Sequence, residues 1–85
     1  MNIAFSSDFL SQSKALTSSQ KSDLYAALEL FEQDPLHAYL SNHPLRAKYK
    51  TYRSIDIAPD LRALYIQKNG EVVFVAVGTH KQLYG

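Results

Sequence analysis

Apolar residues at the start of the chain predict a short strand followed by a first helix. Residues 2–5 (Asn-Ile-Ala-Phe) are typical of a strand. Ser6 or Ser7 then offers a hydroxyl group that can cap a helix, and Asp8 places a negative charge in the favourable first turn. The thin apolar stripe that follows predicts a helix over about residues 7–17.

The second helix has a regular apolar pattern and marked ends. Thr17 and Gln20 have the spacing of a capping box. The Asp34-Pro35 step predicts the end of the helix, because the residue before a proline is pushed out of the α region. Between these limits, apolar residues at i, i+3, i+4 and i+7 share one face: Leu24, Ala27, Leu28 and Phe31.

The second half of the chain changes to strand patterns. Residues 36–51 are mixed and predict one helical turn followed by a short strand. Residues 53–57 alternate in polarity, and residues 61–67 predict the next strand. Asn69-Gly70 is a strong hairpin signal. The apolar run 72–77 shows no alternation, which predicts a strand covered on both faces in the centre of the sheet.

The order of these elements, β-α-α-β-β-β, indicates an α+β fold. We expect two N-terminal helices packed on one side of a mostly antiparallel, four-stranded sheet. No repeat, linker or low-complexity stretch divides the chain, so residues 1–85 are expected to form a single domain. Within it, Phe74 is expected in the core, and Tyr25, Tyr39 and Tyr65 in the core or half-buried.

The composition excludes several classes of protein. Apolar residues make up 46% and charged residues 20% of the chain, as in globular rather than disordered proteins. Cysteine is absent, so no disulfide or thiolate metal site supplements the small core, which fits a reducing cytosol. No apolar run approaches the roughly 20 residues that cross a bilayer. The N-terminal sequence also lacks the regions of a secretory signal, so we expect a cytoplasmic protein without membrane contact.

Charge is distributed unevenly although the net charge is only +1. Residues 1–34 hold two basic and five acidic residues, a net charge of −3, whereas residues 35–85 hold seven basic and three acidic residues, a net charge of +4. Four of the basic residues fall within residues 46–53. The cluster has two interpretations, a solvated surface or a phosphate-binding face.

The residue types that could carry chemistry favour proton transfer and anion binding over metal binding. The three histidines have no cysteine partner and no ligand spacing on one helix face, and we interpret His37 as structural. The chain also lacks a glycine-rich phosphate loop and a nucleophile elbow. Candidates for proton transfer and anion binding lie near the ends of predicted strands: His43, Asp56, Asp60, Arg62, His80 and Tyr84.

Strand alternation assigns a face to two of these candidates. Asp56 alternates with Ile55 and Ile57, so it faces away from the apolar side, and we interpret it as a surface acid. Arg62 shares a strand face with Leu64 and Ile66, and a charge on such a largely apolar face needs a partner.

Four stretches of the second half resemble one family of small proteins. They are His43-Pro44-Leu45, Tyr52-Arg53, the run Asp56 to Tyr65 (Asp-Ile-Ala-Pro-Asp-Leu-Arg-Ala-Leu-Tyr) and the run Val77 to Tyr84 (Val-Gly-Thr-His-Lys-Gln-Leu-Tyr). In their order and spacing they look like the YafQ branch of the RelE/ParE toxin superfamily, over essentially the whole chain. The resemblance implies a RelE-like fold. It also implies a type II toxin of a bacterial toxin–antitoxin pair that enters the ribosomal A site and cleaves the mRNA there.

The resemblance further implies the residues of the site. His43, Asp60 and His80 match the catalytic positions of the family. Tyr84 stands where the family has an aromatic residue, and Arg62 lies where RelE-type members keep a phosphate-contacting arginine.

Three positions depart from the YafQ-like pattern. Asp56 stands where these members usually have histidine, Leu61 where they have tryptophan, and Ala76 where they have an active-site arginine. Loss of cationic donors predicts weaker stabilisation of a phosphorane-like transition state.

RNA cleavage without a metal or other cofactor needs a base for the 2′-hydroxyl, an acid for the leaving 5′-oxygen and cations on the non-bridging oxygens. Histidine suits acid or base because its unperturbed pKa of about 6.5 lies near working pH. We assign His80 as general acid, and Asp60 with His43 as base or as the pair that orients it. Arg62 would contact the scissile phosphate, and Tyr84 would stack on a base or position the phosphate. Further basic residues would bind the RNA backbone: Arg46, Lys48, Lys50, Arg53 and Lys81.

Two alternatives stay open beside the ribosome-dependent nuclease, because one fold hosts several functions. One is a ParE-like toxin that inhibits DNA gyrase without cutting, and the other is a catalytically degenerate member kept as an antitoxin-bound repressor partner. His43 and His80 together favour the nuclease, whereas Leu61 and Ala76 favour the gyrase inhibitor or an attenuated enzyme. A cognate antitoxin is expected to lay a helix or strand over the basic face in every case. DNA would then be contacted only indirectly, through the antitoxin complex, whereas the nuclease would also bind the ribosome and mRNA.

Overall fold

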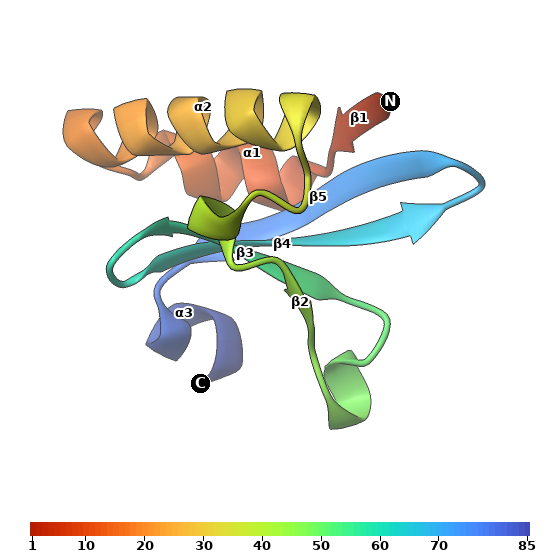
Figure 1. Ribbon diagram of the computed structural model, residues 1–85. Helices are drawn as coiled ribbons and strands as arrows, with labels where there is room; N and C mark the ends of the chain where they lie inside the picture. Colours follow the sequence, from red (N-terminus) through yellow and green to blue (C-terminus); the bar gives the residue numbers. More distant parts are fainter.

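Five strands form one mixed sheet with two helices on one face in the computed structural model, which describes all residues 1–85 (Figure 1). The elements in chain order are β1 (Asn2–Phe5), α1 (Ser7–Lys14), α2 (Ser18–Gln33), the 3-10 turn η1 (Ala38–Leu40), β2 (His43–Pro44), the 3-10 turn η2 (Ala47–Tyr49), β3 (Arg53–Ala58), β4 (Leu61–Lys68), β5 (Glu71–Gly78) and α3 (His80–Tyr84).

The first helix begins as predicted and ends earlier. Ser6 is its N-cap, with a side chain that accepts a hydrogen bond from the backbone N–H of Phe9. The helix stops at Lys14 instead of running to about residue 17. Thr17 has an extended backbone (φ −67°, ψ 166°) because it caps the next helix, so it cannot also belong to the first.

The second helix confirms the sequence prediction at both ends. The Thr17 hydroxyl accepts from the backbone N–H of Gln20, and the Gln20 side chain accepts from the backbone N–H of Thr17. Asp34 leaves the helical conformation just before Pro35. The predicted apolar face packs on the sheet through three buried residues and the partly buried Leu28: Leu24, Ala27 and Phe31.

The sheet has the strand order β1-β5-β4-β3-β2, in which only the β1–β5 pairing is parallel. The predicted α+β class with a mostly antiparallel sheet is therefore confirmed, but the predicted count of four strands is wrong. The short strand expected within residues 36–51 pairs with β3 as β2 and becomes a fifth strand. The tail after Gly78 also folds, as α3, because Thr79 and Gln82 form a second capping box.

The β4–β5 hairpin turns at Asn69-Gly70, as predicted. Both residues have positive φ, 53° and 77°, the signature of the type I′ turn that matches strand twist. Lys68 stands opposite Glu71 across the turn.

The prediction that β5 is covered on both faces is only partly correct. Although β5 lies between β1 and β4, its residues that face away from the two long helices, such as Val73, are half-exposed.

The core between the helices and the sheet is built around aromatic rings. Phe74 is fully buried, and Tyr65 is 2% exposed. The Phe31 ring lies 5.0 Å from the Tyr65 ring and 5.2 Å from the Phe74 ring, centroid to centroid. The prediction was wrong for Tyr25 and Tyr39, which are 64% and 81% exposed. Tyr25 follows the buried Leu24 and so points about 100° away from the core, and in η1 it is Leu40 that is buried.

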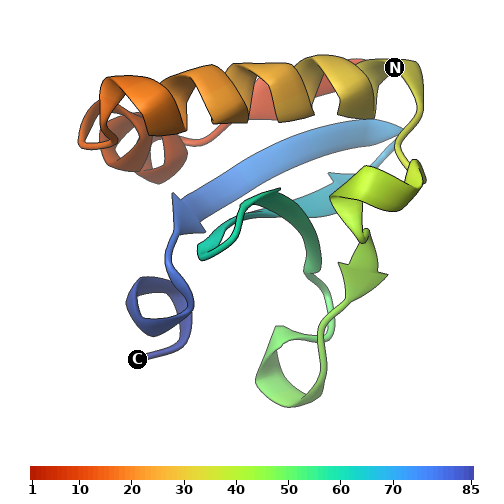
Figure 2. The same ribbon diagram turned by 60° about the vertical axis from the view of Figure 1, so that its left-hand side comes forward.

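The opposite face of the sheet carries a second, smaller layer. Figures 1 and 2 show α1 and α2 on one side, with α3 and the η2 loop on the other. Leu64, buried on β4, lies on this second side, next to its cross-strand partner Ser54. No helix has the length and apolar character that a membrane crossing requires.

We predict that Thr17→Ala lowers the free energy of unfolding by about 1 kcal/mol, because it removes the side-chain acceptor of the α2 capping box. Urea unfolding followed by circular dichroism measures the change. Ser18→Ala, at the exposed first helical position, is the control and should leave stability nearly unchanged. Equal effects of the two substitutions would contradict the role of the cap.

Candidate active site

A cleft of about 410 Å³ opens on the face of the sheet that α3 and η2 flank. Its lining comes from four separate segments of the chain: His43, Leu45, Arg46, Tyr49, Arg62, His80 and Tyr84. Four of the five residues predicted to be catalytic from the sequence are among them, together with one of the five predicted RNA-binding residues, Arg46.

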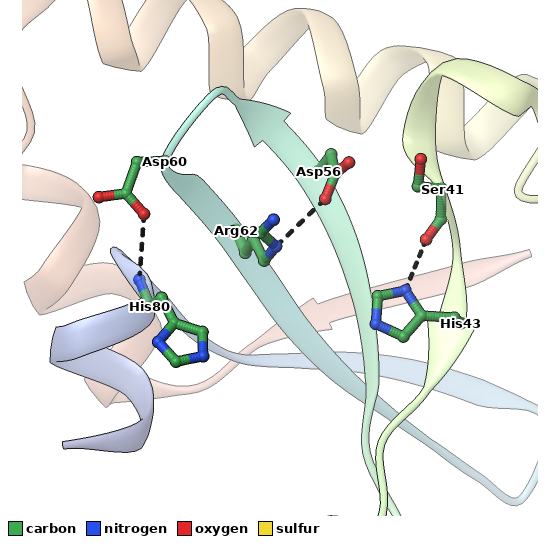
Figure 3. Close-up of polar contacts among 6 residues, drawn as sticks. All are labelled: Ser41, His43, Asp56, Asp60, Arg62 and His80. Carbon is green, nitrogen blue, oxygen red and sulfur yellow. Dashed lines mark hydrogen bonds and ion pairs between the residues drawn. The ribbon is translucent and has the colours of Figure 1, made fainter.

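His43 enters the cleft from β2, where it pairs with Ser54 of β3. Its Nδ1 atom lies 2.7 Å from the backbone carbonyl oxygen of Ser41 (Figure 3). A carbonyl oxygen only accepts hydrogen bonds, so Nδ1 carries the hydrogen. In the neutral ring Nε2 therefore holds the lone pair, which is the arrangement that a general base needs.

Arg62 lies on β4, opposite Asp56 of β3 and Gly78 of β5. Its Nε is 3.3 Å from Asp56 Oδ1 (Figure 3). Asp56, which is half-exposed, is therefore the partner that the position of the Arg62 charge on its strand predicts. This ion pair uses Nε, so the N–H donors of the two Nη groups stay available for phosphate oxygens.

His80 and Tyr84 come from α3, one helical turn apart. Their rings meet edge to face at 4.8 Å between centroids, and Tyr84 makes a second such contact with Tyr49 at 5.5 Å. Gly78 lets α3 pack this closely on β5, since a Cβ there would lie 2.9 Å from Gln82 Oε1.

Asp60 lies in the turn between β3 and β4 and does not line the cleft. Its Oδ1 accepts a long hydrogen bond, 3.5 Å, from the backbone N–H of His80 (Figure 3). The contact joins the β3–β4 turn to the first residue of α3.

The four other residues predicted to bind RNA do not line the cleft, and they differ in exposure and contacts. Lys48 is exposed, with Nζ 5.2 Å from the centre of the Tyr49 ring. Lys50 and Lys81 are also exposed. Arg53 differs, because it is half-buried and its Nε donates to Asn42 Oδ1 at 2.8 Å.

The departures from the family pattern have distinct places. Leu61 is 2% exposed and belongs to the core on the helix side of the sheet. Ala76 pairs with Leu64 on the cleft side, so this position supplies no cation to the cleft. The guanidinium groups that line the cleft are those of Arg62 and Arg46.

Sequence reasoning missed Tyr49 and Leu45 as walls of the cleft, and also Asn42 behind it. One signal for Tyr49 was present. Tyr49 and Tyr52 alternate with the basic residues of the 46–53 cluster, a composition typical of nucleic-acid-binding segments. No group of three or more His, Cys, Asp or Glu side chains is arranged to hold a metal ion.

Comparison with models of known protein families shows to which family the chain belongs. The family described as bacterial toxin of type II toxin-antitoxin system, YafQ, matches residues 1–85. The chain belongs to this family. A comparison with curated protein sequences gives no match.

Solved structures agree with the assignment to the YafQ toxins. YafQ from E. coli strain BL21(DE3) is 26% identical, with a TM-score of 0.85 over 99% of this chain and 98% of that one. The toxin in the E. coli DinJ-YafQ toxin-antitoxin complex is also 26% identical, with a TM-score of 0.82 over 99% and 97%. The RelB-RelE antitoxin-toxin complex from Methanococcus jannaschii matches at 16% identity and a TM-score of 0.76, over 95% of this chain and 94% of that one, and shows the shared fold.

We predict that Gly78→Ala loosens α3. The added Cβ would lie 2.9 Å from Gln82 Oε1 and 3.2 Å from Gln82 Cβ, so the Gln82 side chain would have to give up its bond to the backbone N–H of Thr79. The free energy of unfolding should fall by about 1–3 kcal/mol in urea titrations. The cost should shrink in a Gln82→Ala background, and an equal cost in both backgrounds would rule out this clash as the cause.

Proposed function

We propose that this YafQ-family toxin is an endoribonuclease that cleaves mRNA in the ribosomal A site. The observation that carries the proposal is the composition of the cleft, where two imidazoles and two guanidinium groups from three separate segments line one space. Acid, base and phosphate-binding groups are the set that RNA cleavage through the 2′-hydroxyl requires.

The proposed reaction proceeds by attack of the neighbouring 2′-oxygen on phosphorus. His43 Nε2 takes the proton of the 2′-hydroxyl as the P–O bond forms. The bond to the 5′-oxygen breaks, and His80 donates a proton to that oxygen, which leaves a 2′,3′-cyclic phosphate and a free 5′-hydroxyl. Arg62 donates hydrogen bonds to the non-bridging oxygens, whose charge rises in the transition state.

The remaining predicted residues have supporting roles in this proposal. Tyr84 stacks on a base next to the scissile phosphate, with Tyr49 as the neighbouring wall. Arg46, Lys48, Lys50 and Lys81 hold flanking backbone of mRNA or ribosomal RNA. Arg53 was also predicted to bind RNA. In this proposal it instead holds the loop before β2, because its Nε donates a hydrogen bond to Asn42 Oδ1.

Openness of the cleft supports dependence on the ribosome. His43 and His80 are both exposed, so water screens the charge interactions of these two rings in the free protein. A ribosome closing around the mRNA would exclude that water and strengthen the same contacts. Activity on free RNA is therefore expected to be low, and action on ribosomes implies a cytoplasmic location.

A cognate antitoxin is the second proposed partner. The E. coli YafQ relative has been solved in complex with its antitoxin DinJ. By analogy, an antitoxin bound over the basic face would cover the cleft and block RNA. Contact with DNA would then occur only through the antitoxin complex.

We predict that His80→Ala strongly slows codon-registered cleavage of a reporter mRNA in a reconstituted translation reaction. Loss of a general acid should slow cleavage by about 10²–10⁴-fold, measured as new 5′ ends by primer extension. His37→Ala is the matched control, because His37 lies outside the cleft, at the start of η1.

Intact mRNA under full translation by the parent protein would contradict the nuclease. A DNA supercoiling assay would then test inhibition of gyrase. Inactivity in both assays, together with antitoxin binding, would indicate the degenerate member.

We predict that Arg62→Ala slows the same cleavage by about 10²–10³-fold, through loss of transition-state charge stabilisation. Lys68→Ala, which removes an exposed cation from the other end of β4, is the control and should retain the parent rate. A similar loss in both variants would point to general electrostatic attraction and against a specific contact with the phosphate.

A further inference from the structure

Asn42, the residue before His43, makes three hydrogen bonds that none of the roles above explains. Its Nδ2 donates to the backbone oxygen of Pro35 at 2.9 Å and to the hydroxyl oxygen of Tyr65 at 2.8 Å. Its Oδ1 accepts from Arg53 Nε at 2.8 Å. Both hydrogens of the amide group and one of its acceptor positions are therefore used.

The three partners belong to well-fixed parts of the molecule. Tyr65 is 2% exposed, and its ring packs against Phe31 and Phe74 in the core. Arg53 begins β3, and Pro35 directly follows the C-cap of α2. One side chain thus ties the loop to a helix end, a strand and the aromatic core.

The loop that Asn42 holds carries a backbone conformation that needs support. Ser41 has φ 46° and ψ 43°, in the left-handed region that disfavours residues other than glycine. In this conformation its carbonyl oxygen meets His43 Nδ1 at 2.7 Å. Ser41, whose carbonyl oxygen sets the tautomer of His43, is therefore held in place by the neighbouring Asn42.

We propose that Asn42 is a positioning residue for His43. Its amide holds the Ser41 carbonyl against Nδ1, and this contact presents the Nε2 lone pair to the cleft. The catalytic meaning of this role rests on the proposed function, in which Nε2 takes the proton of the 2′-hydroxyl. The tautomer itself is a property of the free protein and needs no RNA.

The first test is ¹⁵N NMR of the imidazole rings in the isolated protein. The parent should show His43 with hydrogen on Nδ1 in its neutral form. Asn42→Ala should convert His43 to a mixture that includes the Nε2–H tautomer, while the ring signals of His80 stay unchanged. Asn2→Ala, an exposed asparagine on β1, is the matched control and should leave both rings as in the parent.

Two further variants separate positioning from folding. Asn42→Asp keeps an acceptor for Arg53 but loses both donors, and Tyr65→Phe keeps the core ring but removes one acceptor. Both should give intermediate tautomer populations. If Asn42→Ala does not fold, Tyr65→Phe decides the question.

Kinetics provide the second test. In the ribosomal assay, Asn42→Ala should reduce kcat by about 10-fold or more with little change in KM, since misplacing a catalytic group affects the chemical step. A folded variant with the parent tautomer would overturn the proposal, as would an Nε2–H tautomer of His43 in the parent. Absence of cleavage by the parent would overturn the proposed nuclease and leave the NMR result to stand on its own.

Discussion

Burial of one face of β4 determines on which side of the sheet the candidate site residues can lie. Leu61, Ala63 and Tyr65 pack toward the helices, and alternation along the strand then forces Arg62 and Leu64 onto the cleft face. A shift of register by one residue would bring a guanidinium into an aromatic core, at a cost of several kcal/mol. The same packing that stabilises the fold therefore directs the Arg62 side chain into the cleft.

Local signals predicted the two N-terminal helices and the hairpin, because each depends on residues close in sequence. The capping box at Thr17 and the turn at Asn69-Gly70 are complete within a few residues. By contrast, β2 joins the sheet only because β3 pairs with it, and in η1 it is Leu40 rather than Tyr39 that is buried. Such outcomes depend on tertiary packing, which periodicity does not contain.

The sequence predicted most of the residues of the candidate site, but it did not predict the contacts that position them. Residue types and the family resemblance selected His43, Arg62, His80 and Tyr84, which line one cleft. Spacing could not show that Asp60 contacts the first residue of α3, nor that Asn42 supports the loop before His43 through its bond to Pro35. Those roles follow from contacts between residues far apart in the chain, which only the folded molecule reveals.

The type I′ turn of the β4–β5 hairpin has a practical consequence. Arg62 and the turn lie toward opposite ends of β4, seven residues or about 23 Å apart along the strand. The chain has no native cysteine, so a single thiol introduced beside this turn would accept a fluorophore at one defined place. Binding of ribosomes or of an antitoxin could then be followed by anisotropy, with the dye kept clear of the cleft.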